Sequence, residues 1–499
     1  MQENVCEHEE TKEYQDVRKW GNIMNDMILI LDRSQEYGME LARRLRAEQI
    51  DAKIVHADTA AEEIRSFEPR GMILCGEASG ELDGEILQLG IPVLAVGRAA
   101  YRLLACMGGA NAGEAITEKK AHVVYGRSDL FTGVADGDRF FREAQTLMLP
   151  ADVIETASAG GCTIAFEDTA NKHYGVQFEL ERNDLEGAQI LTNFVLDICG
   201  CSRTWTLDTA LEQAQQMLAG AAAQGSHAIC AISGGVDSTL CALLAHRAFG
   251  GKMTAIFIDT GLMREGEADD VQKTMEAFGI DMLRVDRSEE VLAALAGKHS
   301  MEDKREVVVA FMQAELLRRS AQIAGPKTLV LGTNYSDYLE SGSGAPKWCG
   351  SGMTVVEPLT ALFKDEIRAI GRMLEMGEEL VGRKPFPALG LGARIVGEVT
   401  HARLEALRKA ERIFRMEIEQ AGMERKLYKY FPVFIGGERY GSEMIVLRAV
   451  TLSGGQLIPA RLPYDLVERT VESILRELPE ITRVFYDQTP TAIGQESFN

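Results

Sequence analysis

The sequence contains no run of about 18 or more consecutive apolar residues, so it predicts no membrane-spanning helix. Its first 26 residues, MQENVCEHEETKEYQDVRKWGNIMND, also lack the basic-then-apolar order of a secretory signal. We therefore expect a cytoplasmic protein whose chain starts with a polar, mostly acidic extension. The nine cysteines are scattered over 499 residues, and without a secretory signal this argues against a disulfide framework.

The cysteines give a zinc site little support. Cys199 and Cys201 form a C-x-C pair, but no second pair with zinc-site spacing follows it. We therefore expect buried thiols here, and a metal site is the minor alternative.

Basic residues are few relative to acidic ones. The chain has 53 Lys and Arg against 75 Asp and Glu, a formal net charge of −22. This balance argues against a protein that coats nucleic acid, because phosphate binding rests on Lys and Arg. A local basic pocket for a phosphorylated small molecule is compatible with it.

Short apolar runs alternate with helical periods along residues 27–205 and again along residues 206–383. Such alternation is typical of parallel sheets with helices on both faces. Over residues 384–499, amphipathic helices alternate with strand-like segments in a pattern that suits a small sheet with helices on one face. We therefore predict an α/β fold class: a polar extension over 1–26, two doubly wound, mostly parallel-sheet domains, and a C-terminal α+β domain.

The segment CAISGGVDSTLCALLA, residues 230–245, runs from a strand-like approach through two adjacent glycines into an apolar helix. Glycines let backbone N–H groups approach an anion closely, and the helix N-terminus adds a favourable partial charge. The loop is not a Walker A loop, because no G-x-x-x-x-G-K-[ST] pattern is present. Ser233, Ser238 and Thr239 supply hydroxyl groups, and Asp237 can reach a magnesium ion. Two glycines alone would equally fit a tight turn that binds no ligand.

The whole string SGGVDS resembles the pyrophosphate-binding loop of the N-type ATP pyrophosphatases, which split ATP between its α and β phosphates. Further segments resemble the GMP synthase family in that family's order: FIDTGLMR (257–264), GTNYSDYLES (332–341), EPLTALFKDEIR (357–368), RKPFPALGLGARIVGEV (383–399), LRAVT (447–451) and RLPYDLVER (461–469). The first domain is similar to the family's class I glutamine amidotransferase domain through ILILD, IPVLAV and YGVQF. In this family an acceptor carbonyl oxygen is adenylated, and ammonia then displaces AMP.

The resemblance implies roles for individual residues. It assigns ATP and Mg²⁺ to the glycine loop and to a second strand end: Ser233, Gly234, Gly235, Val236, Asp237, Ser238, Gly332 and Thr333. Asp237 would hold the magnesium ion, and Asp259 falls where the family handles the adenosine portion. Lys364 would counter the charge that develops on the phosphates, so Asp237 and Lys364 are the expected catalytic residues. Arg394 and Arg448 fall in the acceptor region; taken singly, Lys364 and Arg394 would equally fit surface ion pairs.

The amidotransferase-like domain departs from the family pattern at each catalytic element. Gly97 stands where the nucleophilic cysteine belongs, and Glu179 stands where the histidine belongs, although Glu181 retains the glutamate. The oxyanion loop, usually Gly-Gly-Pro, reads Gly76-Glu77-Ala78. Cys106 is no substitute, because on a helix it would lie about 13 Å along the axis from Gly97. A thiolate nucleophile needs a base and an oxyanion hole, so we expect no glutaminase activity.

The acceptor side departs from the family as well. The Gly/Ser-rich segment 340–354 follows a strand end, which favours a lid over a plain surface loop. The family's lid carries a lysine and paired histidines, whereas this segment has PKWCGSGMT and no histidine. In the tail QTPTAIGQESFN, Gln488 stands at the position of a phosphate-binding lysine, and Gly494-Gln495 replace Glu-Trp. These changes put the binding of xanthosine monophosphate in question, but not the binding of ATP.

Three functions fit these observations. The first is a GMP-synthase-like ligase that adenylates a purine nucleotide with ATP and takes free ammonia. The second is a paralogue that adenylates another acceptor. The third is a non-catalytic ATP-binding protein, against which the intact SGGVDS and FKDE segments argue. The C-terminal domain resembles the family's dimerisation domain, so we expect a homodimer, with no nucleic-acid or membrane partner; a separate glutaminase partner is left open.

Overall fold

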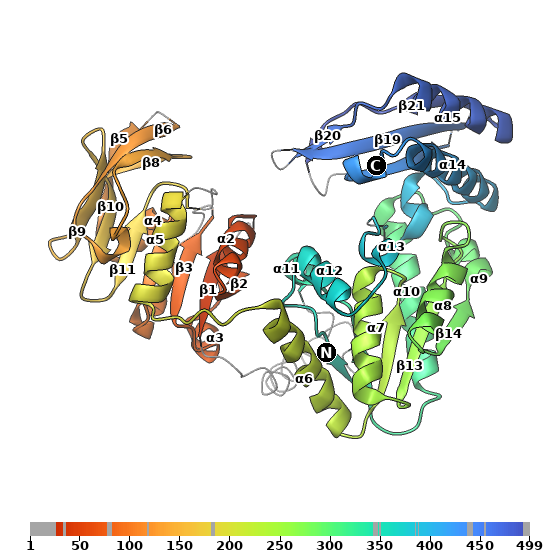
Figure 1. The fold of residues 1–499 in the computed structure, drawn as a ribbon, viewed down its shortest axis with the longest axis horizontal. Helices are drawn as coiled ribbons and strands as arrows, with labels where there is room; N and C mark the ends of the chain where they lie inside the picture. Colours follow the sequence, from red (N-terminus) through yellow and green to blue (C-terminus); the bar gives the residue numbers. More distant parts are fainter. Residues whose placement is uncertain are drawn as a thin grey trace. The chain divides into compact units, whose positions relative to one another are not determined.

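The computed structural model describes residues 26–32, 36–76, 82–116, 119–180, 185–342, 348, 351–384, 386–387, 389–436, 443–453 and 456–492 (Figure 1). These residues form two compact units. The N-terminal unit is built from the chain up to Gln213 with Ser336–Gly342, and the C-terminal unit from Ala214–Tyr335 with the chain beyond Gly342. The finer domain boundaries at 205/206 and 383/384 stay predictions. Some residues of the predictions lie outside the described residues: Glu77, Ala78, Glu181, Gly494, Gln495 and, in the expected lid, 343–347 and 349–350.

The N-terminal unit is organised around one large mixed sheet with the strand order β2-β1-β3-β4-β11-β10-β9-β6-β7. Its first five strands are parallel: β2 Asp51–His56, β1 Met27–Asp32, β3 Gly71–Cys75, β4 Val93–Val96 and β11 His173–Val176. The rest are antiparallel: β10 Cys162–Asp168, β9 Ile154–Ala159, β6 Lys120–Tyr125 and β7 Gly137–Phe140. The strands β5 Ala110–Ile116 and β8 Ala144–Met148 form a separate pair.

Helices follow the parallel strands of this unit, as the alternating sequence pattern predicts. They are α2 Glu36–Ala47, α3 Ala61–Ser66, α4 Ala99–Cys106 and α5 Leu185–Thr192, with the short turns η1 Gly84–Leu89, η2 Asp129–Phe131 and η3 Asn193–Ile198. The strands β3 and β4 are buried along their whole length, which explains why they read as continuous apolar runs. Their side chains pack with those of α4 in one core that includes Met72, Val93 and Leu103.

The C-terminal unit contains a fully parallel sheet with the order β14-β13-β12-β15-β16. Its strands are β14 Met282–Asp286, β13 Met253–Asp259, β12 His227–Ile232, β15 Lys327–Val330 and β16 Met353–Val356. The helices of this part of the unit are α7 Val236–Phe249, α8 Glu267–Ala277, α9 Ser288–Ala294, α10 Met301–Ser320, α12 Lys364–Met373 and α13 Glu378–Val381. The boundary between the units falls within α6 Leu207–Ala223, and α11 Tyr335–Ser341 belongs to the N-terminal unit except for its first residue. The predicted doubly wound α/β class is confirmed.

The last part of the C-terminal unit is the predicted α+β arrangement. Its sheet follows the order β17-β18-β19-β20-β22, and β21 pairs with β19. The elements are η5 Gly390–Arg394, β17 Ile395–Val396, α14 His401–Gln420, η6 Glu424–Lys426, β18 Lys429–Ile435, β19 Glu443–Ser453, β20 Gln456–Pro459, α15 Tyr464–Glu477, β21 Ile481–Tyr486 and β22 Thr491–Ala492. Apolar side chains of α14 and α15 pack with Phe434, Ile445 and Leu447 of the sheet in a core that extends to Leu262 and Val308 of the preceding part.

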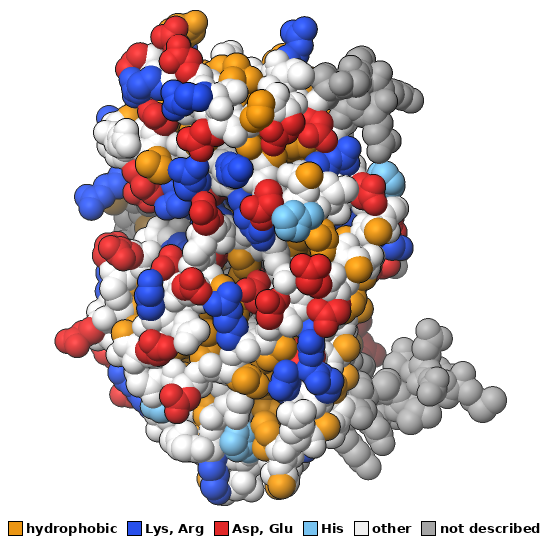
Figure 2. All heavy atoms as spheres, turned by 90° about the vertical axis from the view of Figure 1, so that its right-hand side faces the viewer, with side chains coloured by type: hydrophobic (Ala, Val, Ile, Leu, Met, Phe, Trp, Pro, Cys, Tyr) orange, Lys and Arg blue, Asp and Glu red, His pale blue; other side chains and the backbone are white. Residues whose placement is uncertain are grey.

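The surface carries charges of both signs. Figure 2 shows acidic and basic side chains interspersed over the described residues of one face. Within the part of the chain that the structure describes, no helix is long and apolar enough to cross a membrane.

Candidate active site

The glycine loop connects the central strand β12 to α7 at the carboxyl end of the parallel sheet. β13 pairs with one edge of β12 and β15 with the other, so the strand order reverses here. Ligands of open α/β sheets bind at such a reversal. Gly234 has a φ of +81°, a conformation that favours glycine, and Gly235 is the N-cap of α7, which begins at Val236. The loop therefore lies at a helix N-terminus at the position where a phosphate would bind.

Hydroxyl groups hold the loop against the first turn of α7. Ser238 Oγ accepts a hydrogen bond from the backbone N–H of Ser233 at 3.2 Å and lies 3.0 Å from Ser233 Oγ. Thr239 Oγ1 donates to the carbonyl of Gly235 at 2.9 Å. The predicted serines thus fix the loop's shape, and Ser233 Oγ also accepts from the N–H of Gly235 at 3.4 Å.

Two predicted catalytic residues meet beside this loop. The ammonium of Lys364, the first residue of α12, is ion-paired with the carboxylate of Asp237 in the first turn of α7. Asn334, which follows β15, donates its side-chain N–H to the same carboxylate oxygen at 3.3 Å. Phe363 and Ile367 are fully buried and anchor the start of α12, which fixes where Lys364 lies. One carboxylate, one ammonium and one amide from three elements therefore converge at the loop.

The segment after β15 packs directly on the first turn of α7. A Cβ added at Gly332 would lie 3.1 Å from the backbone nitrogen of Ser238, so this position requires glycine or a shift of the backbone. Thr333 donates its hydroxyl to the carboxylate of Glu357 at 2.5 Å. The structure thus places Gly332 at the loop, while Thr333 connects the segment to Glu357.

Arg383 is a loop contact that the sequence prediction missed. Its guanidinium donates to the carbonyl oxygen of Gly234 at 2.8 Å and forms an ion pair with the buried Glu267 of α8, also at 2.8 Å. By occupying the carbonyl, Arg383 fixes the peptide plane of the glycine loop. Arg383 and Asn334 both lie in segments that resemble the family, but neither residue type by itself pointed to this role.

Asp259 ends β13 beside a polar hollow. One carboxylate oxygen accepts from the N–H of Gly261 at 3.0 Å, and the other pairs with Arg284 at 2.8 Å; Arg284 also contacts Asp269 at 2.6 Å. Asp259, Asp269, Arg284 and Arg408 line the hollow. Arg408 of α14 donates to the carbonyl of Gly261, so the C-terminal α+β part helps to shape the loop after β13.

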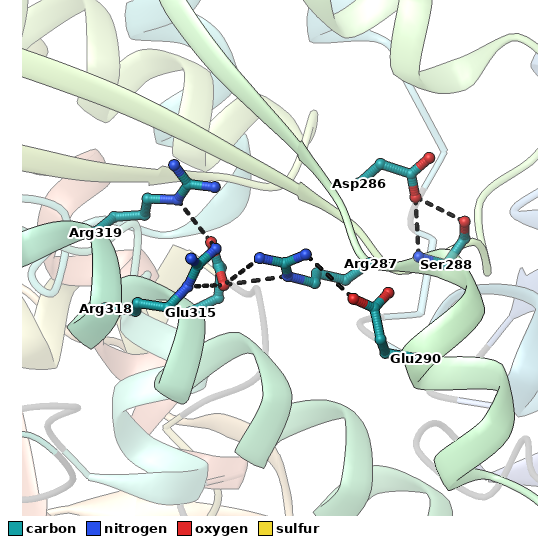
Figure 3. Close-up of polar contacts among 7 residues, drawn as sticks. All are labelled: Asp286, Arg287, Ser288, Glu290, Glu315, Arg318 and Arg319. Carbon is teal, nitrogen blue, oxygen red and sulfur yellow. Dashed lines mark hydrogen bonds and ion pairs between the residues drawn. The ribbon is translucent and has the colours of Figure 1, made fainter.

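A cluster of arginines around one carboxylate supports the adjacent strand end (Figure 3). Glu315 of α10 accepts from Arg287 at 3.2 Å, and from Arg318 and Arg319 at 2.7 Å. The backbone N–H of Arg287 donates to the carbonyl of Asp259 at 2.8 Å. Burial opposes ionisation of Glu315, but the hydrogen bonds from the three arginines outweigh it and lower its pKa from 4.5 to about 2.

Glu315→Gln is expected to destabilise the C-terminal unit by about 3 kcal/mol at neutral pH, because a pKa difference of about 2.5 is lost. The folded pKa is the lower one, so this contribution is present above pH 4.5 and disappears as the pH falls toward about 2. Urea unfolding at a series of pH values should therefore show the wild-type and variant stabilities converging in that window. Glu290→Gln, which removes an exposed partner of Arg287, is the control and should have little effect. A difference between wild type and Glu315→Gln that is the same at every pH would contradict this assignment.

The two predicted acceptor-side arginines lie in the α+β part. Arg394 is buried, with its guanidinium carbon 4.6 Å from the ring centre of Phe431 and 5.2 Å from that of Phe386. Arg448 of β19 is also buried and contacts groups of the C-terminal segment: Asp487, Thr489 and Thr491. These described contacts are all with residues beyond 384, so they do not join either arginine to the glycine loop.

The site fits a magnesium ion. Oδ1 of Asp237 is buried and has no hydrogen-bond partner among the described residues. Mg²⁺ is commonly held by one or two carboxylates together with substrate phosphates and water. No group of three or more His, Cys, Asp or Glu side chains suited to a metal occurs within the described ranges. A single carboxylate that shares the ion with a bound nucleotide is therefore the arrangement that suits this chain.

Gly97, predicted to stand at the place of the nucleophile, lies in a sharp turn between a strand and a helix of the N-terminal unit. Gly97 follows β4 and precedes α4, has a φ of +64°, and donates its N–H to the carbonyl of Val176 at 2.8 Å. A Cβ at this position would meet nothing within 4 Å. β4 and β11 are parallel neighbours, so Gly97 and Glu179 follow strands that end at the same edge of the sheet. The two positions that the sequence predicts to be substituted thus lie at one edge of the sheet.

Arg142 joins two segments of this unit. Its Nε pairs with Glu179 at 3.0 Å, and its Nη1 donates to the hydroxyl of Tyr37 at 2.5 Å, with the guanidinium 4.0 Å from the centre of that ring. Tyr37 lies on α2, which follows β1, and Glu179 follows β11. Two strands, β3 and β4, separate β1 from β11, a distance of about 14 Å at the usual strand spacing. The Tyr37–Arg142–Glu179 bridge therefore joins segments that follow two non-adjacent strands, β1 and β11.

The thiols of the N-terminal unit are poor nucleophile candidates. Cys199 and Cys201 are buried, as expected, and burial raises the pKa of the Cys201 thiol to about 12. Cys106 is exposed at the end of α4, with its sulfur 3.6 Å from the carbonyl of Leu82. The C-x-C pair therefore has the environment of core thiols.

Known proteins are similar to one region of the chain and to nearly all of it. Residues 211–400, which contain the glycine loop, Asp259 and Lys364, match the NAD synthase family. Over 504 residues, 93% of this chain and 98% of that protein, the chain is 34% identical to the GMP synthase [glutamine-hydrolyzing] of Geobacillus kaustophilus. It is equally 34% identical, over 94% of its length, to the enzyme of the same name from Caldanaerobacter subterraneus, of which it covers 98%.

The fold and the loop chemistry define the class first. The SGGVDS loop lies where the strand order of a parallel sheet reverses, in a region that matches the NAD synthase family. These features define an ATP-dependent, AMP-forming ligase. Within this class, 34% identity to GMP synthases over nearly the whole chain shows the family. The chain belongs to the GMP synthase family.

Proposed function

We propose that this protein is a GMP-synthase-like ligase that adenylates a purine nucleotide such as xanthosine monophosphate and aminates it with free ammonia. The carbonyl oxygen of the acceptor attacks the α-phosphorus of ATP, and pyrophosphate leaves. Ammonia then forms the carbon–nitrogen bond, and that oxygen leaves with AMP. The observation that carries this proposal is the convergence of Asp237 and Lys364 at the glycine loop.

Each loop group has a role in this chemistry. The backbone N–H groups at the start of α7 would hold the pyrophosphate, and Arg383 keeps the loop in that shape by binding the carbonyl of Gly234. Lys364 would stabilise the charge that develops on the phosphates. A magnesium ion bound at Asp237 would neutralise phosphate charge. Asp259 and the hollow beside it would take the adenosine portion, since β13 ends next to the loop.

The oxygen atom gives a direct test. Xanthosine monophosphate labelled with ¹⁸O at the carbonyl that is aminated should transfer the label to the phosphate of AMP. Unlabelled AMP formed together with aminated product would exclude adenylation of the acceptor. No AMP from this nucleotide, with ATP still bound, would instead favour the alternative of a paralogue for another acceptor, which Gln488 and the altered lid segment suggest.

We further propose that the N-terminal unit does not hydrolyse glutamine. Gly97 has no side chain to serve as nucleophile, and Glu179 replaces the base with a carboxylate that is already paired with Arg142. Ammonia must then come from solution or from a separate glutaminase partner.

Gly97→Cys by itself is expected to give no glutaminase activity. There is room for the side chain, since a Cβ here meets nothing within 4 Å, although the φ of +64° strains any residue other than glycine. Glu179 in the place of the histidine leaves no base to form the thiolate. Glutamate release from glutamine, measured beside the matched Gly97→Ser variant, checks this. Thiol labelling at position 97 confirms that the cysteine is accessible. Release in Gly97→Cys above that of Gly97→Ser would show that another group supplies the base.

Two wider expectations complete the proposal. We place the protein in the cytoplasm as a homodimer joined through its C-terminal α+β part, because that part resembles the family's dimerisation domain. Sedimentation of the full chain tests the dimer, and a monomer at micromolar concentration would exclude it.

A non-catalytic ATP-binding role is the remaining alternative, and it predicts ATP binding without pyrophosphate release.

A further inference from the structure

A small cavity in the N-terminal unit is lined by a guanidinium of which two nitrogens have no hydrogen-bond partner among the described residues. Arg102 lies on α4, one turn beyond Gly97. Its Nε and Nη2 are buried, and among the described residues neither has a hydrogen-bond partner. Burying a charged donor without a partner is strongly unfavourable. A group that accepts hydrogen bonds from both nitrogens would remove this cost.

The remaining wall of the cavity is largely apolar. Leu31 and Leu74 come from the carboxyl ends of β1 and β3, and the rest of the lining besides Arg102 is Ala57, Cys75, Leu82 and Ala99. The thiol of Cys75 lies 3.8 Å from the carbonyl of Leu31, to which it donates. Of the described residues that line the cavity, Arg102 is the only charged one. The cavity thus offers a positive charge and N–H hydrogen-bond donors within a largely apolar wall.

The volume of the cavity limits its occupant to a small species. It is about 10 Å³, enough for about one water-sized group. A water molecule that accepts from both guanidinium nitrogens would direct its own two hydrogens at apolar side chains. An anion accepts from both nitrogens, donates nothing and neutralises the charge. An anion therefore matches this cavity better than water does.

We propose that this cavity binds a small monatomic anion such as chloride between Nε and Nη2 of Arg102. The site lies at the carboxyl edge of the parallel strands, where α/β sheets bind ligands, and a few residues from the turn at Gly97. It is independent of the proposed ATP chemistry, because its residues all belong to the N-terminal unit. The unit would thus bind a ligand although its catalytic positions have changed.

Hydrogen exchange on the full chain tests the site locally. We expect amide exchange in residues 71–75 and 99–106 to slow about threefold or more in chloride, relative to gluconate at equal ionic strength. Gluconate is too large for the cavity. Arg102→Leu should abolish the difference, and Arg65→Leu, which removes an exposed arginine of the same unit, should retain it. Equal exchange in the two salts, or a difference that persists in Arg102→Leu, would overturn the proposal.

The counter-charge could instead come from the chain itself. Glu77 and Glu81 lie in sequence between Gly76 and Leu82, outside the described residues. Glu77→Gln/Glu81→Gln should leave the anion effect intact if the site takes a free anion. Loss of protection in this double variant, with no anion effect in the wild type, would assign the role to these carboxylates and overturn the proposal. If Arg102→Leu unfolds the unit, Arg102→Lys serves instead, and it should require about tenfold more anion.

Discussion

Replacing Lys364 by methionine is expected to lower the rate of pyrophosphate release by about 10²- to 10³-fold, while the fold is retained. The ammonium of Lys364 is the cation that the structure places against Asp237 beside the glycine loop. Methionine keeps the length of the side chain but removes the charge that would stabilise the transition state. Because α12 is anchored by the buried Phe363 and Ile367, the helix should not move. Steady-state release of pyrophosphate measures the effect.

Two further variants make this result specific. Lys273→Met removes an exposed lysine of α8, 76% exposed, and should leave the rate unchanged. Asp237→Asn should also lose activity, and combining it with Lys364→Met should cost much less than the product of the two single effects, since the residues contact each other. A fully additive double variant, or a Lys364→Met enzyme with a rate near that of the wild type, would contradict a shared role at the phosphates.

Gly234→Ala is expected to abolish ATP turnover, with a loss of about 10²-fold or more. Gly234 has a φ of +81°, and a Cβ built there would lie 2.4 Å from a methyl group of Val271. Alanine would therefore have to change the loop backbone, and the N–H groups that would bind phosphate would lose their alignment. The KM for ATP should rise and the rate of turnover should fall.

Gly235→Ala tests whether the phosphate approaches the loop backbone closely, without changing the conformation of the loop. Gly235 has an ordinary extended conformation, with φ −79° and ψ 161°, and a Cβ there would meet only Ser233 Oγ, at 3.6 Å. This variant should fold with the loop unchanged. The added methyl group should weaken ATP binding only if a phosphate contacts the backbone at Gly235. Equal, undiminished turnover in Gly234→Ala and Gly235→Ala would show that the loop does not bind the nucleotide.

The fold was largely predictable from the sequence because its signals are local. Apolar runs such as MILILD and GMILC are buried strands, and the glycines of SGGVDS mark a turn between a strand and a helix. The fold class followed from the alternation of these signals. The antiparallel half of the N-terminal sheet carries no comparable signal, since strand order depends on pairing between distant segments.

A residue of the site was predictable where it lies in a segment that resembles the family. Asp237 and Lys364 are 127 positions apart in the sequence, and only the family resemblance suggested that both lie at the phosphates. Arg383 and Arg142 could not be found in this way. Arg383 acts on a backbone carbonyl, and Arg142 joins groups that are brought together by the order of strands in the sheet. The roles assigned to Asp259, Arg394 and Arg448 stay predictions.

The central claim is that an intact adenylation site takes free ammonia because its own amidotransferase-like unit is inactive. AMP formation from ATP, Mg²⁺ and xanthosine monophosphate, measured with ammonium alone and with glutamine alone, tests it most directly. We predict AMP and pyrophosphate in equal amounts with ammonium, and neither with glutamine. Turnover supported by glutamine alone would contradict the account.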